Sequence, residues 1–218
     1  MERAHRIGVA ICLAGIAACT NLPRSRDLAN PDVSGKVLAQ QVCSNCHGVI
    51  GTSISPGIPN LAAQQEAYLV AELKGFRKES RRDPAGFEYM WGISRSLTDR
   101  QIDELAQYFS AQKPVLQSNE GEPARIEAGR ALVAAGVPDK GVPPCGTCHG
   151  PDARGNGTFP RLAGQHLDYL VKQLTVFQRT DERPEGAVMK TIAHALTKDQ
   201  FLSAAAYLQA QPNSVSSQ

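Results

Sequence analysis

The sequence predicts an all-α fold made of two similar tandem domains related by internal duplication. Apolar residues recur at helical spacing in both halves, whereas signals for β-strands are weak throughout. The second half also repeats landmarks of the first: Cys43 and Cys145 lie 102 positions apart, and Met90 and Met189 lie 99 apart. A repeat of this length indicates duplication of a whole domain, and 218 residues are enough for two small domains.

Each half is expected to open with a helix that leads to a cysteine motif. The first helix runs roughly from Ser34 to Cys46, and the second runs from Pro123 to Ala135. In the second half a loop from Gly136 to Pro144, rich in glycine and proline, separates the helix from its motif.

A middle helix and a final helix follow in each half. Leu69, Leu73 and Phe76 form an apolar stripe at i, i+4 and i+7, which Leu170, Leu174 and Phe177 repeat. The final helices are expected to begin at capping boxes with hydrophobic staples and to end at a proline. The residues concerned are Thr98 with Gln101, Thr197 with Gln200, Leu97 with Ile102, Leu196 with Phe201, Lys113-Pro114 and Gln211-Pro212.

These elements divide the chain into six parts. They are a signal peptide (1–18), a polar tether (19–33), a first domain (34–113), a linker (114–123), a second domain (124–211) and a disordered tail (212–218).

The N-terminal segment reads as an export signal. Arg3 and Arg6 precede an apolar stretch from Ile7 to Ala18 that is too short to span a bilayer. The stretch ends in Ile-Ala-Ala-Cys, which resembles a bacterial lipobox, so lipidation of Cys19 and membrane attachment are expected. Ordinary cleavage near Ala17 or Ala18 is the alternative, and a retained membrane helix is a weaker one. Export to the periplasm is expected with either cleavage.

The sequence Cys-x-x-Cys-His occurs twice, and it is the attachment pattern for c-type haem. Two thiols three residues apart share a helix face and can reach the two vinyl groups of one porphyrin. The histidine that follows can then bind iron. The motifs predict two covalently attached haem c groups, held by Cys43, Cys46, Cys145 and Cys148, with His47 and His149 as iron ligands.

Met90 and Met189 occupy matching positions and are the expected second iron ligands. A thioether suits haem iron and raises its reduction potential relative to bis-histidine ligation. The alternative is that each methionine only fills core space. His166 and His194 are not repeated in the first half, so both are interpreted as packing or surface residues, although His194 could replace Met189 as a ligand.

Pro59 and Pro160 recur after the two motifs. A backbone carbonyl at each site could accept the Nδ1 proton of the histidine and fix the ring. A merely rigid loop is the alternative.

Other classes of site and partner fit poorly. The net charge of +2 is too small to indicate a nucleic-acid-binding surface. The two Cys-x-x-Cys pairs lie far beyond zinc-ribbon spacing, and no βαβ pattern surrounds either one as in thioredoxin. The glycine-rich run at Gly155-Asn156-Gly157 lacks the strand and the Lys-Ser/Thr of a phosphate loop.

These residues resemble the class I c-type cytochromes, and the doubled arrangement resembles the cytochrome c4 family. The resemblance covers most of residues 34 to 211. It rests on Cys-x-x-Cys-His-Gly in both halves, on Pro-x-Leu-Ala-Gly-Gln at Pro160 to Gln165, on one methionine per half, and on Tyr108 and Tyr207 in the final helices. The first half departs from the pattern at Ala63, where the family usually has glycine.

The resemblance implies two cytochrome c domains that face each other across a pseudo-twofold axis, with His/Met ligation at both irons. It also implies transfer of single electrons from a quinol-oxidising complex towards a terminal oxidase. An electron-accepting subunit of a periplasmic dehydrogenase is the alternative function. A dihaem peroxidase is a further one, but it would need an open iron site, which two equivalent methionines argue against. The expected protein is therefore an electron carrier.

Overall fold

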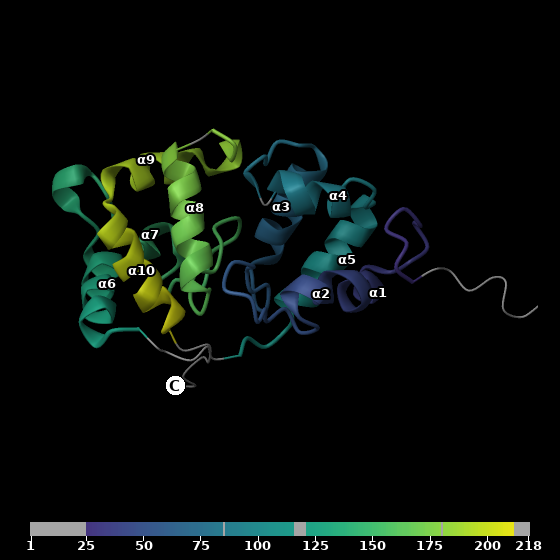
Figure 1. The fold of residues 1–218 in the computed structure, drawn as a ribbon, viewed down its shortest axis with the longest axis horizontal. Helices are drawn as coiled ribbons and strands as arrows, with labels where there is room; N and C mark the ends of the chain where they lie inside the picture. The colour runs from purple at the N-terminus through teal and green to yellow at the C-terminus, as the bar shows by residue number, and fades with distance from the viewer. Residues whose placement is uncertain (1–24, 85, 116–120, 180, 212–218) are drawn as a thin grey trace, which may run out of the picture.

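The computed structural model describes residues 25–84, 86–115, 121–179 and 181–211, and within these ranges it is helical, without a β-strand. The signal peptide, Cys19, residues 116–120 of the linker and the tail lie outside the described residues. Two helical domains lie side by side (Figure 1), with α1 to α5 in the first and α6 to α10 in the second. The expected all-α architecture of two tandem domains is confirmed.

The first domain opens with one continuous helical run that contains a π-helical stretch. Ser34 caps α1 (Gly35–Leu38), which continues as η2 (Ala39–Cys43) and α2 (Ser44–His47). The Ser44 hydroxyl donates a hydrogen bond to the Gln40 carbonyl, which lies in the π-helical stretch. The helix was expected here, but the π-helical stretch was not.

The remaining elements of the first domain are α3 (Glu66–Arg77), η3 (Gly86–Met90), α4 (Trp91–Ser94) and α5 (Asp99–Ser110). The second domain contains α6 (Pro123–Ala135), the 3-10 turn η4 (Pro138–Lys140), α7 (Gly146–His149), α8 (Leu167–Arg179), the 3-10 turn η5 (Pro184–Gly186), α9 (Ala187–Ala195) and α10 (Lys198–Gln209). The structure confirms the middle helices and the loop before the second motif, whereas η3, α4 and α9 were not expected.

The final helices begin as predicted but end earlier. Both capping boxes are present, at Thr98 with Gln101 and at Thr197 with Gln200. The expectation that the helices run to the prolines was wrong. In each domain a loop amide donates a hydrogen bond to a carbonyl in the last turn, where the helix ends. The Phe109 carbonyl accepts from the Ala63 amide, and the Leu208 carbonyl accepts from the Gly164 amide.

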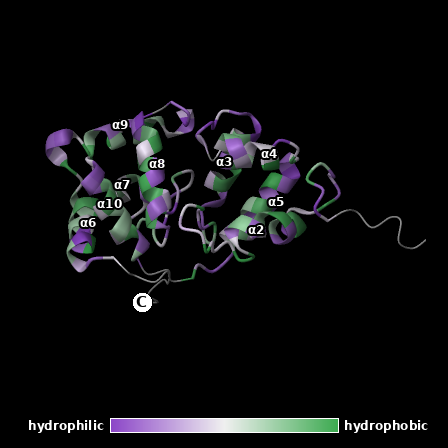
Figure 2. Cartoon of the chain, in the orientation of Figure 1, coloured by the Kyte–Doolittle hydropathy of each residue, from purple (hydrophilic) through white to green (hydrophobic). Residues whose placement is uncertain are grey.

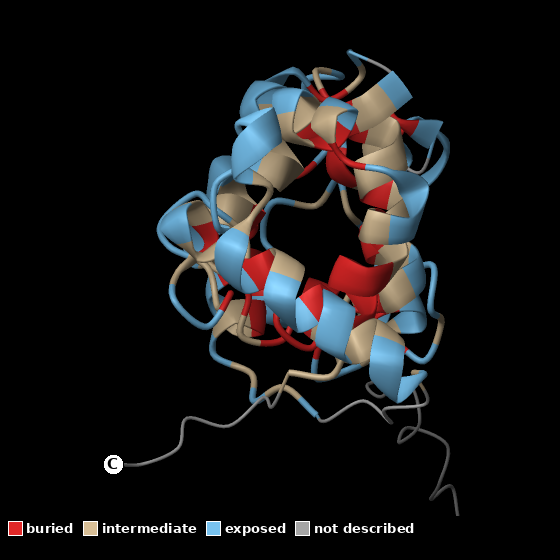
Figure 3. Cartoon of the chain, turned by 90° about the vertical axis from the view of Figure 1, so that its left-hand side faces the viewer, coloured by how far each residue is buried: buried red, intermediate tan, exposed pale blue. Residues whose placement is uncertain are grey.

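The apolar core is divided between the domains. Helices of both domains carry hydrophobic and hydrophilic residues (Figure 2), and their buried residues lie mainly towards the interior (Figure 3). In the first domain Leu38, Ile102, Leu105 and Phe109 form the centre of one cluster. In the second domain two clusters surround α8, one with Leu170 and Leu208 and one with Phe177, Leu196 and Phe201. Both predicted staples therefore belong to the core.

In each domain the first and last helices cross at a glycine. A Cβ atom at Gly129 of α6 would lie 1.9 Å from the Ser203 carbonyl oxygen of α10, and one at Gly35 would lie 2.8 Å from the Gln101 carbonyl oxygen of α5. Such separations are too short for any other residue, so glycine allows these helix backbones to approach.

A buried ionic cluster joins the domains where α3 and α8 face each other (Figure 1). Glu72 of α3 pairs with Arg81 of its own domain and, at 2.6 Å, with Arg183 of the other. Arg81 also pairs with Asp83 at 2.7 Å, and Arg183 donates to the side-chain oxygen of Gln173 at 2.6 Å. Both guanidinium groups are buried.

Candidate functional site

The local fold places each cysteine pair and its histidine on a single helical turn. Cys43 ends η2 and Cys46 and His47 lie in α2, while Cys145 directly precedes α7, which contains Cys148 and His149. All four cysteines are free of disulfides. Both thiols of a motif therefore share one helix face beside the histidine, as attachment to one porphyrin requires.

In both domains a proline carbonyl fixes the histidine ring. The Nδ1 atom of His47 lies 2.9 Å from the Pro59 carbonyl oxygen, and Nδ1 of His149 lies 2.9 Å from that of Pro160. Because a carbonyl only accepts, Nδ1 carries the proton and Nε2 keeps a lone pair for a metal. The predicted role of these carbonyls is confirmed.

Burial keeps both imidazoles neutral. It lowers the pKa of His47 and of His149 below the ordinary value, and the hydrogen bond to the proline carbonyl only partly opposes this effect. Neutral imidazole is the form that binds iron. In the unmodified chain burial also raises the pKa of the Cys43 thiol to about 12.

Equivalent loops hold the two proline carbonyls. In the first domain the amides of Leu61 and Ala62 both donate to the Gly51 carbonyl, and in the second the amides of Leu162 and Ala163 both donate to the Ala153 carbonyl. The same backbone pattern therefore recurs around both histidines.

The methionines lie on separate helical segments. Met90 is the last residue of η3 and Met189 lies in α9, and both are half-buried. Met189 packs against the cluster that contains Phe177 and Leu196. Each methionine thus comes just before the final helix of its domain.

The donor set and its surroundings fit haem. Thiols, an imidazole with a free Nε2 and a thioether are ligands for a porphyrin and its iron. Large exposed apolar side chains adjoin these donors in sequence: Val49 and Ile50 follow the first motif, and Tyr89 precedes Met90. The Phe159 ring meets the His149 ring edge-on, with centroids 6.1 Å apart.

The unrepeated histidines are packing and surface residues, as predicted. His166 is buried, and its Nε2 atom lies 3.0 Å from the Ser53 carbonyl oxygen of the other domain. His194 is exposed, and its Nδ1 atom lies 2.8 Å from the Lys190 carbonyl oxygen in the same helix.

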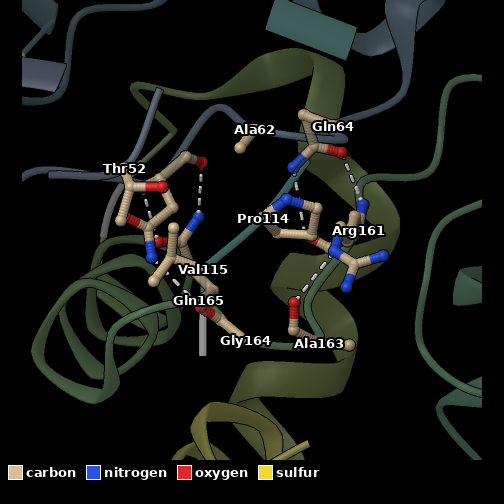
Figure 4. A pocket seen from close by; sticks show the side chains of 10 residues that line it. Thr52, Ala62, Gln64, Pro114, Val115, Arg161, Ala163, Gly164 and Gln165 are labelled. Carbon is tan, nitrogen blue, oxygen red and sulfur yellow. Dashed lines mark hydrogen bonds between the residues drawn. The ribbon is translucent and has the colours of Figure 1, made fainter. Parts of the chain in front are cut away.

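Two glutamines that were not among the predicted site residues lie beside the histidine sites. A small pocket at the domain boundary is lined by residues that include Asn60, Gln64, Arg161 and Gln165 (Figure 4). The Gln64 side chain bonds Arg161, and the Gln165 side chain bonds Asn60. Their recurrence at the end of the repeated Pro-x-Leu-Ala segment was the available signal.

The family model for cytochrome c matches the chain twice, at residues 33–113 and 126–212. The chain belongs to the cytochrome c family. It is 40% identical over 167 residues to cytochrome c-552 of Acidithiobacillus ferridurans, which covers 76% of this chain and 72% of the relative. It is also 34% identical over 179 residues to a thiosulfate dehydrogenase electron acceptor of Thiomonas intermedia, which covers 78% of each protein.

The fold is similar to the crystal structure of reduced recombinant cytochrome c4 from Pseudomonas stutzeri. The TM-score is 0.73 at 33% sequence identity, over 82% of this chain and 97% of the other. The protein is therefore a dihaem class I cytochrome that resembles cytochrome c4, with two covalently attached haem c groups. It is an electron carrier, like the proteins named cytochrome c4 that it resembles. Haem iron supplies the reversible one-electron chemistry, and the protein binds the haem and adjusts its potential.

Proposed function

We propose that this cytochrome carries single electrons between respiratory-chain partners in the periplasm through two six-coordinate haems. In the proposed sites Cys43 and Cys46 attach the first haem, and Cys145 and Cys148 attach the second. His47 and Met90 bind one iron, and His149 and Met189 bind the other. The observation that carries the proposal is the pair of matched hydrogen bonds, each 2.9 Å long, that hold Nδ1 of each imidazole against a proline carbonyl and leave Nε2 free for iron.

Saturated ligation makes outer-sphere electron transfer the expected chemistry. A histidine on one side of each iron and a methionine on the other leave no position for substrate. A peroxidase would need an open position, and the paired methionines argue against it.

The proposed location rests on the N-terminal sequence. Residues 1–18 have the pattern of a lipoprotein signal, and lipid on Cys19 would attach the protein to a membrane. Within the described ranges, no helix has the length and apolar character needed to cross a membrane. Substitution Cys19→Ser should move the protein from the membrane fraction to the soluble periplasmic fraction, whereas ordinary cleavage would leave the distribution unchanged.

The proposed partners are a quinol-oxidising complex as donor and a terminal oxidase as acceptor. A second candidate function is that of the electron-accepting partner of a periplasmic dehydrogenase. The similarity to the thiosulfate dehydrogenase electron acceptor supports this second candidate. The two functions share the haem chemistry and differ in the protein that delivers electrons.

A redox titration of the purified protein followed by its visible spectrum tests the haem assignment. Two one-electron steps and the weak far-red methionine–iron band in the oxidised protein are expected. A single haem, or a spectrum without that band, would overturn it. Rapid mixing with a reduced quinol-oxidising complex, and separately with a dehydrogenase and thiosulfate, then identifies the donor as the partner that reduces the protein within one turnover.

A further inference from the structure

The peptide that orients each histidine is itself held by a glutamine from the other domain. In the first domain the Pro59 carbonyl accepts the Nδ1 proton of His47, and the N–H of the same peptide, on Asn60, donates to Oε1 of Gln165 at 2.8 Å. Gln165 belongs to the second domain. A hydrogen-bonded chain therefore runs from His47, through one peptide group, across the domain boundary.

The second domain repeats this arrangement in the opposite direction. The Pro160 carbonyl accepts the Nδ1 proton of His149. The N–H of that peptide, on Arg161, donates to Oε1 of Gln64 at 2.6 Å (Figure 4). Gln64 belongs to the first domain. The two chains are thus reciprocal.

Each glutamine side chain makes two hydrogen bonds to the backbone of the opposite domain. Nε2 of Gln165 donates to the Asn60 carbonyl, and Nε2 of Gln64 donates to the Arg161 carbonyl, both at 3.0 Å. Both side chains are only 5% exposed. A buried amide with its donor and its acceptor satisfied is held in one orientation, because any other would leave polar atoms without partners.

A hydrogen bond at one end of a peptide group changes the other end. When the N–H donates, electron density shifts towards the carbonyl oxygen, which becomes a stronger acceptor. A stronger acceptor draws the Nδ1 proton of the histidine and makes the imidazole a more basic ligand. A more basic ligand favours oxidised iron and lowers the reduction potential.

We propose that Gln165 and Gln64 are positioning residues that lower the reduction potential of the haem in the opposite domain through the peptide bonded to its histidine. The inference rests on the proposed histidine ligands. These hydrogen bonds would then make the reduction potential of each haem depend on how the opposite domain is placed at the boundary. A partner that alters the boundary would shift the distribution of electrons between the haems.

The test compares Gln165→Ala and Gln64→Ala in the full-length holoprotein. Gln165→Ala should raise the potential of the first-domain haem and speed hydrogen exchange at His47 Nδ1, and Gln64→Ala should do the same for the second-domain haem and His149. NMR resonances of each ligand histidine assign the haems. The equilibrium distribution of one electron between the haems should shift severalfold, in opposite directions in the two variants.

Gln65→Ala is the matched control. Nε2 of Gln65 also crosses the boundary, but it donates to the Arg154 carbonyl at 2.9 Å rather than to the Asn60 or Arg161 carbonyl. It should leave both potentials unchanged. Equal shifts in all three variants, or a shift of the haem in the substituted domain, would show general loosening of the boundary and overturn the proposal.

Gln165→Glu covers the case in which the alanine variants do not fold. The carboxylate keeps an acceptor for the Asn60 N–H and adds negative charge, so it should lower the first-domain potential above the pKa of the new carboxyl. An unchanged or raised potential would overturn the proposal. Absence of two titrating haems in the unsubstituted protein would instead overturn the proposed function, so the two failures are distinguishable.

Discussion

The two ligand histidines show how single side chains prepare the site. Burial alone disfavours the imidazolium ion and lowers the pKa of His47 and His149. The proline carbonyl then decides which nitrogen keeps the proton. At neutral pH each ring therefore presents a neutral Nε2 atom, and no rearrangement is needed for it to bind iron.

Met189 can be tested as an iron ligand by substitution. Met189→Ala should lower the potential of the second-domain haem, because a soft thioether favours the reduced iron, and it should open that haem to carbon monoxide. Carbon monoxide difference spectra and a redox titration measure both effects. Val188→Ala changes the preceding, exposed residue and should leave both unaltered. If Met189→Ala matches that control, Met189 is a packing residue only.

Ala63 is held in a conformation that suits glycine. Its φ is 54°, and Gly164, at the equivalent position of the second domain, has φ 72°. The residue is kept there because its N–H bonds the Phe109 carbonyl at the end of α5. The alanine that replaces the usual glycine at this position therefore strains the local backbone.

Ala63→Gly should stabilise the first domain by about 1 kcal/mol, because relief of the left-handed strain outweighs the greater freedom of glycine in the unfolded chain. Denaturant unfolding measures the change. The neighbouring substitution Ala62→Gly removes a buried methyl group without relieving strain and should destabilise the domain. A loss of stability in Ala63→Gly would show that the methyl group contributes more through packing than it costs in strain.

Among the helices, the crossing of α6 and α10 is the most sensitive contact. Gly129→Ala would put a methyl group 1.9 Å from the Ser203 carbonyl oxygen, so the helices must separate. We expect a loss of about 3 kcal/mol in the free energy of unfolding, which thermal unfolding would detect.

Gly75→Ala is the control for this prediction. A Cβ atom at Gly75 of α3 has its nearest contact at 3.5 Å, so alanine fits and should be tolerated. Equal stability of the two variants would mean that α6 and α10 can separate at little cost.

The elements that the sequence predicted well are those with local signals. Thr98 and Thr197 start helices because their capping boxes involve residues three positions apart, and Pro123 begins α6 where a missing N–H costs nothing. The haem motifs are equally local, since His47 follows Cys46 directly. The role of the Pro59 carbonyl was accessible because it repeats at Pro160.

The elements that the sequence did not predict depend on distant contacts. Helix α5 stops at Ser110 because the loop amide of Ala63 takes the Phe109 carbonyl, and no pattern within the helix encodes that contact. The π-helical stretches η2 and η3 lie beside the site, where the backbone departs from regular geometry. The partnership of Gln64 with Arg161 joins residues 97 positions apart.

The assembled molecule depends on charges that meet only when the two domains come together. Burial by itself would raise the pKa of Glu72, but Arg81 and Arg183 outweigh it and hold the pKa below its ordinary value. Burial likewise opposes ionisation of Asp83, and Arg81 again holds its pKa low. Because Arg183 comes from the second domain, ionised Glu72 contributes to both the first domain and the domain contact.

Glu72→Gln should lower the free energy of unfolding by about 3–5 kcal/mol at neutral pH, because it leaves two buried guanidinium groups with one carboxylate fewer. A carboxylate whose pKa is depressed by folding stabilises the folded state above its unfolded pKa, and this stability is lost as the pH falls through the lower folded value. In denaturant titrations at several pH values, the difference in the free energy of unfolding between the unsubstituted protein and Glu72→Gln should therefore be largest above about pH 5 and shrink on acidification.

Glu185→Gln is the control. It alters an exposed carboxylate that accepts from Ser80 across the same boundary and should change stability by less than about 1 kcal/mol. A pH-independent difference for Glu72→Gln would show that shape, rather than charge, joins the domains at this point.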